Sequence, residues 1–302
     1  MAKANKVIIV GVGHLAGSLG LALMNQKGNP WHVIGIEENQ EFRQIAAKRK
    51  LVHEIHPVAD FAEHCGEAEF IVICVPLNVL PNVVLSCSEA LLAAQRVKKR
   101  TTNPVITDVG SVKSPLLTEF QGGMAPSVPF VGGHPIAGNE KNGPEAAEEN
   151  LFKGRMVVLT PVKKTDMKAV ARVRGLWEGI GCEVEEMPPA EHDQILGATS
   201  HLPHLLAYSL IEAISRLSKP TPKRKGVNLF RYAAGGLRDF TRIAASSSQM
   251  WRDISMENQA MILEALSEFK KVLAAVEEGV ARGDGPKLEE IFRHAEELRK
   301  GL

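Results

Sequence analysis

The sequence lacks the features that mark nucleic-acid-binding, membrane and secreted proteins. Its formal charge is only +1, with 36 basic and 35 acidic side chains, so no global field would attract nucleic acid or anionic lipid. Its longest apolar runs, such as Phe70–Val75, are far shorter than the ~20 residues that span a bilayer. Residues 1–6 lead into a predicted strand without a signal-peptide core. We therefore expect a soluble, cytoplasmic protein with a small-molecule partner, and neither nucleic acid nor a membrane.

Paired cysteines are also missing. The four cysteines lie far apart along the chain, at positions Cys65, Cys74, Cys87 and Cys182. This spacing argues against a disulfide framework and against a zinc site, so we expect reduced, mostly structural cysteines and predict no metal. The chain has 302 residues, which is more than one hydrophobic core usually supports, so two domains are expected.

A glycine-rich turn near the amino terminus indicates dinucleotide binding. The apolar run Lys6–Val10 predicts a buried strand, and it leads into Gly11-Val12-Gly13-His14-Leu15-Ala16-Gly17-Ser18 and a helical pattern. The first glycine suits a sharp turn, the second lets backbone N–H groups approach a pyrophosphate, and Ala16 fills the third small-residue slot. The fingerprint alone is a weak signal because glycine-rich turns are common.

The residues after the next strand strengthen this interpretation. A second apolar run, His32–Ile36, ends at Glu37, about where an acidic residue binds the ribose 2′-hydroxyl of a dinucleotide. Glu37 and the neighbouring Glu38 would repel a 2′-phosphate, so we predict NAD rather than NADP. The alternative is that both glutamates are solvated turn charges.

The rest of the first half alternates between strand and helix patterns, as in an α/β protein with a doubly wound parallel sheet. Further strands are predicted at 70–75, 104–108, 155–160 and 183–187, the last as an edge strand, and helices at 41–50, 77–94 and 167–180. We expect the cofactor to contact Gly11, Gly13, His14, Leu15, Ala16, Glu37, Val75, Pro76 and Ser111.

One histidine stands out in the stretch Gly132–Glu140. His134 lies between glycines and a proline, just after the apolar run 128–131, so we expect its ring on a turn at the carboxyl end of a strand. A histidine there can exchange a proton near neutral pH; the alternative is an ordinary turn histidine. Ser111 should reach the same edge, where it could orient His134 or touch the nicotinamide, or simply be a turn or capping serine.

From Pro188 onward the strand signals stop, and we place the domain boundary between residues 187 and 188. The expected domains are a dinucleotide-binding domain, 1–187, and a helical substrate and dimerisation domain, 188–302. The helix predicted at 189–218 contains Ser200-His201-Leu202-Pro203-His204, where the proline should kink it. His201 and His204 resemble half a metal site, but no carboxylate accompanies them, so bonds to a ligand or to the core are favoured.

Two further patterns in the helical half suggest an anionic ligand and a partner helix. Arg238 and Arg242 stand four residues apart near a predicted helix start, where guanidinium groups could bind a carboxylate or merely face solvent. In the helix predicted at 258–282, apolar residues recur at gaps of four and three: Ile262, Leu266, Phe269, Leu273, Val276 and Val280. Such a seam packs along another helix, within the monomer or in a homodimer.

Taken together, these motifs resemble the prephenate/arogenate dehydrogenase family of tyrosine biosynthesis. The matching segments are 11–18, Asp108-Val109-Gly110-Ser111-Val112-Lys113, Gly133-His134-Pro135-Ile136-Ala137-Gly138, 200–204, Asp239-Phe240-Thr241-Arg242 and Met250-Trp251-Arg252-Asp253, which follow the family's order. The resemblance implies a Rossmann-type domain followed by an all-helical dimerisation domain. It also implies NAD-dependent oxidative decarboxylation of prephenate to 4-hydroxyphenylpyruvate.

The resemblance also implies roles for individual residues. His134 is similar to the family's proton acceptor, and Ser111 to the serine that assists it and helps to hold substrate. Arg242 resembles the arginine that anchors a substrate carboxylate, and Arg238 occupies the position of a supporting basic residue. The remaining pocket residues by resemblance are His204, Asn139 and Glu140, and we add His201 as a substrate-binding candidate from its position.

Other functions remain open at this stage. Glu140 could meet the amino group of arogenate, so an arogenate or dual-specificity cyclohexadienyl dehydrogenase is the first alternative. A β-hydroxyacid dehydrogenase would need a catalytic lysine on the first helix of the second domain, and residues 189–218 contain none. A more remote alternative is a non-catalytic dinucleotide-binding sensor. The sequence shows no pattern for a regulatory amino-acid-binding domain after Trp251.

Overall fold

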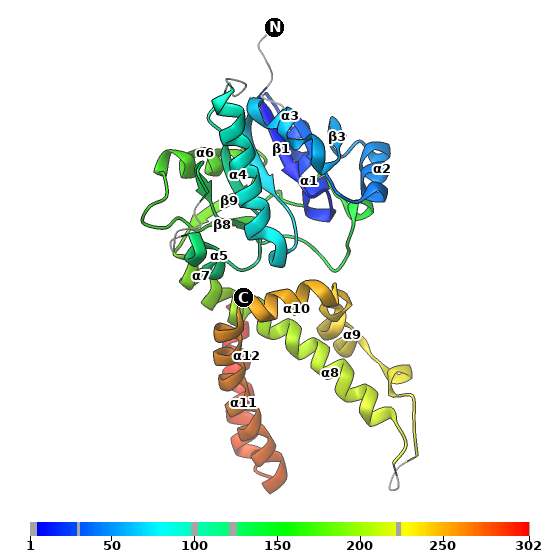
Figure 1. Ribbon diagram of the computed structural model, residues 1–302. Coiled ribbons are helices and arrows are strands. Elements are labelled where there is room, and N and C mark those ends of the chain that lie inside the picture. The colour runs from blue at the N-terminus through cyan, green and yellow to red at the C-terminus, as the bar shows by residue number, and fades with distance from the viewer. Residues whose placement is uncertain (1–4, 29–30, 98–101, 121–125, 222–224, 302) are drawn as a thin grey trace.

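The computed structural model describes residues 5–28, 31–97, 102–120, 126–221 and 225–301. An α/β half is built from the first part of the chain, and a helical half projects from one side of it (Figure 1). This arrangement confirms the predicted fold class. The last strand ends at Glu186, and the elements from Pro189 onward are helical.

A six-stranded parallel sheet forms the centre of the α/β half. Its strands lie in the order β3-β2-β1-β4-β5-β6, which is the strand order of dinucleotide-binding doubly wound sheets. The strand bounds are β1 Lys6–Val10, β2 His32–Ile36, β3 Glu54–His56, β4 Ala68–Ile73, β5 Val105–Asp108 and β6 Phe130–Val131. The short edge strand β3 was not predicted, because its sequence Glu-Ile-His has no apolar run.

Helices cover both faces of this sheet because successive strand residues point in opposite directions. On β1, Val7 and Ile9 pack against α1 (His14–Met24) and α6 (Met167–Glu178). Ile8 and Val10 pack on the other face, against α4 (Leu80–Arg96) and α5 (Ser114–Glu119). Two further helices, α2 (Gln40–Arg49) and α3 (Phe61–His64), flank the β3 edge. The β1 side chains from Val7 to Val10 are each at most 6% exposed, as expected for a sheet that helices cover on both faces.

The stretch Leu77–Arg96, which includes α4, is the one helix of the described chain that is long and apolar enough to cross a membrane. Its Leu80, Val84 and Leu91 are at most 1% exposed, and they pack on the central sheet. Burial of these side chains accounts for the apolar composition of α4, which is a core helix of the α/β half.

The strands after β6 do not extend the parallel sheet, and that part of the prediction is wrong. Instead β7 (Gly133–Pro135), β8 (Met156–Leu159) and β9 (Glu183–Glu186) form a separate three-stranded sheet in which β7 runs antiparallel to β8. The chain leaves the first sheet at Gly132, where a Cβ atom would lie 2.5 Å from Thr160 Oγ1. His134 therefore sits within a short strand, paired with Val158, and not on a turn.

The helix predicted at 189–218 is interrupted where the proline signal placed a kink. It consists of α7 (Pro189–Leu196), a π-helical turn at Gly197–His201 and α8 (Leu202–Ser218). Pro203 lies in the first turn of α8, where its missing N–H removes the least hydrogen bonding. The π-helical turn buries His201, which is 1% exposed.

The remaining helices are α9 (Gly235–Thr241), α10 (Ser248–Glu257), α11 (Gln259–Arg282) and α12 (Gly285–Arg299). Helices α11 and α12 lie against each other, and this pair diverges from α8 as both leave the α/β half (Figure 1). The predicted seam of α11 is only partly covered: Leu273 is 51% and Val280 66% exposed. Phe292 of α12 is 55% exposed as well, so both helices present apolar side chains to the outside.

Candidate active site

The glycine turn after β1 has the shape that a dinucleotide pyrophosphate requires. Gly11 has φ +84°, and a Cβ atom there would lie 2.7 Å from the carbonyl oxygen of Cys74, so only glycine fits. A Cβ on Gly13 would meet nothing within 4 Å, which leaves open space in front of α1. Gly13 offers no side chain to cap that helix, so the amino-terminal N–H groups of α1 face this space. Nε2 of His14 is buried without a described partner. These features fit a bound dinucleotide phosphate.

Glu37 is buried, at 8% exposure, so it is not a solvated turn charge. Its Oε2 accepts a hydrogen bond from Val12 N–H at 2.6 Å, and its Oε1 accepts one from Asn39 N–H at 2.8 Å. The carboxylate thus ties the end of β2 to the glycine turn. Each carboxylate oxygen has a second lone pair, so Glu37 can still accept a hydrogen bond from a ribose hydroxyl.

His134 is held by a chain of polar side chains from the helical half. Its Nδ1 lies 2.8 Å from Nε2 of His192, and Nδ1 of His192 lies 2.7 Å from Oδ1 of Asp193. Asp193 also accepts hydrogen bonds from the backbone N–H groups of Lys113 at 2.9 Å and Ser114 at 2.7 Å. Helix α7 thereby fixes both the catalytic candidate and the loop that carries Ser111.

These contacts determine which nitrogen of His134 can act as a base. Burial raises the pKa of Asp193, but the hydrogen bonds from His192 and Ser114 outweigh it and leave the pKa below its ordinary value. Asp193 is therefore a carboxylate, which requires His192 to donate from Nδ1 and, when neutral, to accept at Nε2. His134 must then donate from Nδ1, so its Nε2 keeps a free lone pair.

The surroundings also keep His134 neutral. Burial lowers its pKa well below the ordinary value, and the neighbouring His192, Lys113 and His201 lower it further. A neutral imidazole at physiological pH can accept a proton, which is the state that a general base requires.

A buried ion pair joins the Ser111 loop to the strand of His134. Lys113 and Asp108 are both fully buried, and Nζ of Lys113 bonds to Oδ2 of Asp108 and, at 2.9 Å, to the carbonyl of Gly133. Asp108 in turn accepts hydrogen bonds from the N–H groups of Gly110 at 2.8 Å and Gly133 at 3.1 Å. The pair therefore fixes β5, the Ser111 loop and β7 relative to one another.

Ser111 lies half-buried in this loop, after the carboxyl end of β5. It does not cap α5, because that helix has Lys113 as its N-cap and Asp193 accepts from the N–H of Ser114. The described contacts do not include a hydrogen bond between Ser111 and His134. Val75 and Pro76 follow β4 at the same edge of the sheet, and Pro76 is exposed.

The two histidines around Pro203 face different partners. Nδ1 of His201 accepts a hydrogen bond from the Asn258 amide at 3.0 Å, and burial lowers the pKa of His201 to about 4. His204 donates from Nδ1 to the carbonyl of Ser200 at 2.8 Å, and its ring stacks on Trp251 with centroids 3.7 Å apart. Each ring thus makes a hydrogen bond within the protein. Nε2 of a neutral His204 can still accept another hydrogen bond.

The helical half reaches the loop after His134 through Arg242. Nη1 of Arg242 lies 2.6 Å from Oε2 of Glu140. Burial lowers the pKa of His204, and the charge of Arg242 lowers it further. Because the Arg242 side chain is 60% exposed, the ion pair itself adds little stability. Arg238 is exposed and donates to the carbonyl of Ala233, while Asn139 is exposed and accepts from the N–H of Lys141.

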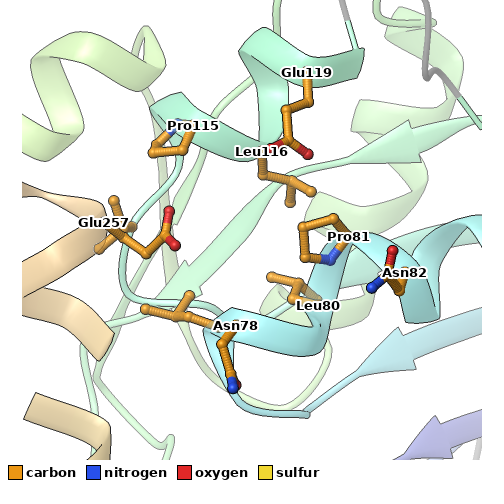
Figure 2. Close-up of a pocket in the computed structure, with 10 residues that line it drawn as sticks. Asn78, Leu80, Pro81, Asn82, Pro115, Leu116, Glu119 and Glu257 are labelled. Atoms are coloured by element: carbon orange, nitrogen blue, oxygen red, sulfur yellow. The ribbon is translucent and has the colours of Figure 1, made fainter. Parts of the chain in front are cut away.

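A cavity of about 330 Å³ lies behind the Ser111 loop, where α10 approaches α4 and α5 (Figure 2). Glu257 and Glu119 line it together with Asn78, Asn82 and apolar side chains. Burial raises the pKa of Glu257, and the charge of Glu119 raises it further. The lining does not include His134, Arg242 or the other predicted site residues. This cavity is therefore distinct from the candidate active site.

Several residues that shape the site were not predicted as site residues. They are Asp108, Lys113, His192, Asp193, Trp251 and Asn258. One signal was available for the α7 pair: His192 and Leu196 stand four residues apart, so a polar residue shares the buried face of the helix. Lys113 gave no such signal, because a single lysine after a strand usually faces solvent.

Two family models cover most of the chain. The model described as "Prephenate dehydrogenase, nucleotide-binding domain" matches residues 19–186. The model described as "Prephenate dehydrogenase, dimerization domain" matches residues 188–294.

Individual relatives agree with these models. A prephenate dehydrogenase of Bacillus subtilis (strain 168) is 33% identical over 98% of this chain and 76% of its own length. A cyclohexadienyl dehydrogenase of Zymomonas mobilis is 32% identical over 98% of this chain and 95% of its own. Among solved structures, prephenate dehydrogenase from A. aeolicus in complex with hydroxyphenyl propionate and NAD+ is 34% identical with a TM-score of 0.86, covering 99% of this chain and 98% of that one.

Proposed function

Because the chain belongs to the prephenate dehydrogenase family, we propose that it catalyses the NAD-dependent oxidative decarboxylation of prephenate to 4-hydroxyphenylpyruvate. This reaction is a step of tyrosine biosynthesis. The observation that carries the proposal is the chain of hydrogen bonds from Asp193 through His192 to His134, which leaves a neutral imidazole with a free Nε2 lone pair.

His134 accepts the proton of the ring hydroxyl through Nε2. Loss of this proton raises the electron density on the carbon that bears the hydroxyl, and this carbon releases hydride. The bond to the ring carboxylate breaks in the same overall reaction, carbon dioxide leaves, and the ring becomes aromatic as its oxygen takes the proton back from His134. NAD, when bound at the glycine turn, accepts the hydride. His192 and Asp193 stabilise the positive charge that His134 gains, since Asp193 is a carboxylate in the resting enzyme.

The substrate carboxylates are held by residues that line the approach to His134. Arg242 binds the side-chain carboxylate of the substrate with its guanidinium group, and this contact replaces its ion pair with Glu140. Arg238, Asn139 and His204 complete the pocket, and Ser111 contacts both substrate and nicotinamide. The predicted substrate contact of His201 is not retained, because this ring is 1% exposed and bonded to Asn258. Substrate orientation over the cofactor supplies much of the rate enhancement, because aromatisation already drives the reaction forward.

The proposal extends to the cofactor contacts and the assembly, which the family membership supports. NAD binds along Gly11, Gly13, His14, Leu15 and Ala16, with its ribose on Glu37 and its nicotinamide near Val75, Pro76 and Ser111. The two domains meet at residues 187 and 188, between the matched ranges 19–186 and 188–294. The exposed apolar side chains of α11 and α12 support a homodimer through the helical half. The enzyme acts in the cytoplasm.

A comparison of substrates tests the proposal directly. We expect NADH to form when the purified protein receives NAD and prephenate, with a lower kcat/KM for arogenate and no turnover of simple β-hydroxyacids. Glu140 is the reason to include arogenate, because its carboxylate could receive an amino group. A higher kcat/KM for arogenate than for prephenate would show that arogenate is the preferred substrate. If NADH forms with neither compound, the proposed enzymatic role is rejected.

Arg242→Gln tests the carboxylate clamp. We expect a KM for prephenate raised about tenfold, which is the lower end of what a charge-assisted hydrogen bond contributes, because Arg242 is largely exposed. The kcat should change much less, since the clamp holds substrate and transition state alike. Arg216→Gln on α8 removes an exposed pair with Glu212 and is the matched control. An unaltered KM in Arg242→Gln rejects the clamp.

A further inference from the structure

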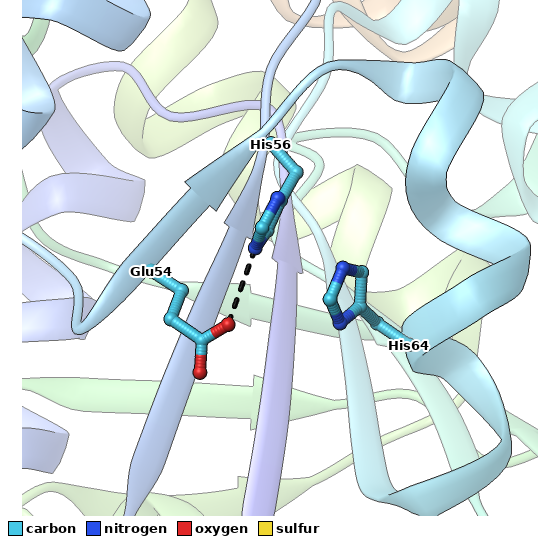
Figure 3. Close-up of side chains that lie close together, drawn as sticks. All are labelled: Glu54, His56 and His64. Atoms are coloured by element: carbon cyan, nitrogen blue, oxygen red, sulfur yellow. Dashed lines mark hydrogen bonds and ion pairs between the residues drawn. The ribbon is translucent and has the colours of Figure 1, made fainter.

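A second group of potential ligands lies at the β3 edge of the sheet, apart from the residues assigned to cofactor and substrate. Glu54 and His56 stand two residues apart on β3, so their side chains share one face, and His64, the last residue of α3, lies beside His56 (Figure 3). Nε2 of His56 lies 3.2 Å from Oε2 of Glu54, and the rings of His56 and His64 stack with centroids 4.2 Å apart.

The surroundings of this group supply further imidazole and carboxylate groups. Nε2 of His32 lies 2.6 Å from Oε1 of Glu54, and the ring of His53 stacks on His32 with centroids 4.8 Å apart. Oδ2 of Asp60 lies 3.9 Å from Nδ1 of His56. Four of the ten histidines of the chain therefore gather around one carboxylate. Imidazole nitrogens are ligands that transition-metal ions prefer, so this group of histidines favours the binding of such an ion.

We propose that Glu54, His56 and His64 bind a divalent transition-metal ion of the zinc class, with water at the remaining position. One atom from each residue lies within 4.8 Å of the other two. In tetrahedral zinc sites each ligand atom lies about 2.0–2.2 Å from the metal, so two ligand atoms are roughly 3.4 Å apart. Side-chain rotations that move the ligand atoms of this group by about 1 Å would therefore complete the site. The hydrogen bond from His32 fixes the orientation of Glu54, as carboxylate and histidine partners outside the coordination shell commonly do.

The burial of the three side chains suits an ion that enters from solvent. All three residues are half-buried, so the backbone and side-chain stems are held while the ligand atoms remain accessible. The donor set suits it too: Glu54 offers one carboxylate oxygen to the ion while Nε2 of His32 holds the other oxygen at 2.6 Å. This site departs from the sequence-based expectation of no metal, because that expectation considered cysteines and the pair His201 and His204 only.

The ion acts as a structural clip at the edge of the cofactor domain. It joins β3 to α3, two elements that a short segment containing Pro57 separates in sequence. The backbone carbonyl of His56 accepts a hydrogen bond from the N–H of Glu37 at 3.0 Å, so the clip is connected through the backbone to the residue that holds the glycine turn. Because the ion binds the folded chain through residues of two elements, it should raise the thermal stability of the protein.

Zinc titration of the full chain tests the site. After removal of any affinity tag and of metal by a chelator, we expect His64→Ala to bind one Zn²⁺ fewer per chain than wild type in isothermal titration calorimetry. His294→Ala, which removes an exposed histidine of α12, should bind as wild type does and is the matched control. We also expect saturating Zn²⁺ to raise the Tm of wild type by about 5 °C, with no rise from this site in His64→Ala. Equal stoichiometry and affinity in wild type and His64→Ala overturn the proposal.

A second measurement does not depend on how well the variants fold. In crystals of wild type soaked in Zn²⁺, anomalous scattering at the zinc edge should place an ion between Glu54, His56 and His64. Zinc found only on the histidines around His134 would overturn the proposal, as would an absence of bound zinc. Circular dichroism of metal-free His64→Ala checks that its fold is intact.

Discussion

Replacement of His134 by asparagine is expected to lower kcat by about 10²–10⁴-fold, the usual contribution of a positioned proton acceptor. The Kd for NAD should remain close to that of wild type, because the glycine turn and Glu37 follow β1 and β2, whereas His134 lies on β7. Turnover of prephenate and fluorescence titration with NADH measure the two quantities. The same substitution at the exposed His294 should alter neither one. Unchanged turnover in His134→Asn would show that another group accepts the proton.

The pH profile of wild type provides an independent check on the same residue. Burial, followed by His192, Lys113 and His201, lowers the pKa of His134 well below 6.5. His134 is therefore neutral and active above that lowered pKa, and its activity is lost as the pH falls through it. We expect kcat/KM to stay level from pH 8 down to about 6.5 and to decline only at lower pH. A decline centred above pH 6.5 would contradict a lowered pKa of His134.

Replacement of Lys113 by methionine is expected to lower the free energy of unfolding by about 3–5 kcal/mol, because it leaves the carboxylate of Asp108 buried without its cation. Denaturant unfolding followed by fluorescence measures the change. Lys271→Met, which removes an exposed pair with Glu268, should cost less than about 1 kcal/mol and is the matched control.

A double variant separates the lost charge from the lost packing. Asp108→Asn combined with Lys113→Met removes both charges, so we expect it to be more stable than Lys113→Met alone. The recovery should be partial, since an asparagine has one acceptor oxygen and the N–H groups of Gly110 and Gly133 need two. If Lys113→Met unfolds within about 1 kcal/mol of wild type, the pair does not hold the Ser111 loop to β7.

Local patterns were sufficient to predict most elements of the α/β half. The apolar runs that became β1, β2, β4 and β5 are bounded by glycine, proline or acidic residues, and burial on both faces makes such runs unmistakable. The edge strand β3 lacks this signal, because only one side of it pairs with another strand and its residues are half-buried. The proposed metal site was missed together with it.

The second sheet could not be predicted from runs of residues. Strands β8 and β9 have strand patterns, but the patterns carry no information about which strand each one joins. The antiparallel pairing of β7 with β8 depends on the contact between Gly132 and Thr160 and on the bond from Gly133 to Asp108. These contacts form only when the chain is folded.

What the sequence determined by itself is the set of parts: the glycine turn, the acidic end of β2, and His134, Ser111 and Arg242 as the predicted site residues. The tertiary structure alone decided how the parts act. His134 meets His192 across 58 residues and Lys113 meets Asp193 across 80, and neither partner differs locally from an ordinary polar residue of a helix. The physical reason is that periodicity reports which face of an element is buried, whereas a hydrogen-bond partner and a protonation state depend on what that face is buried against.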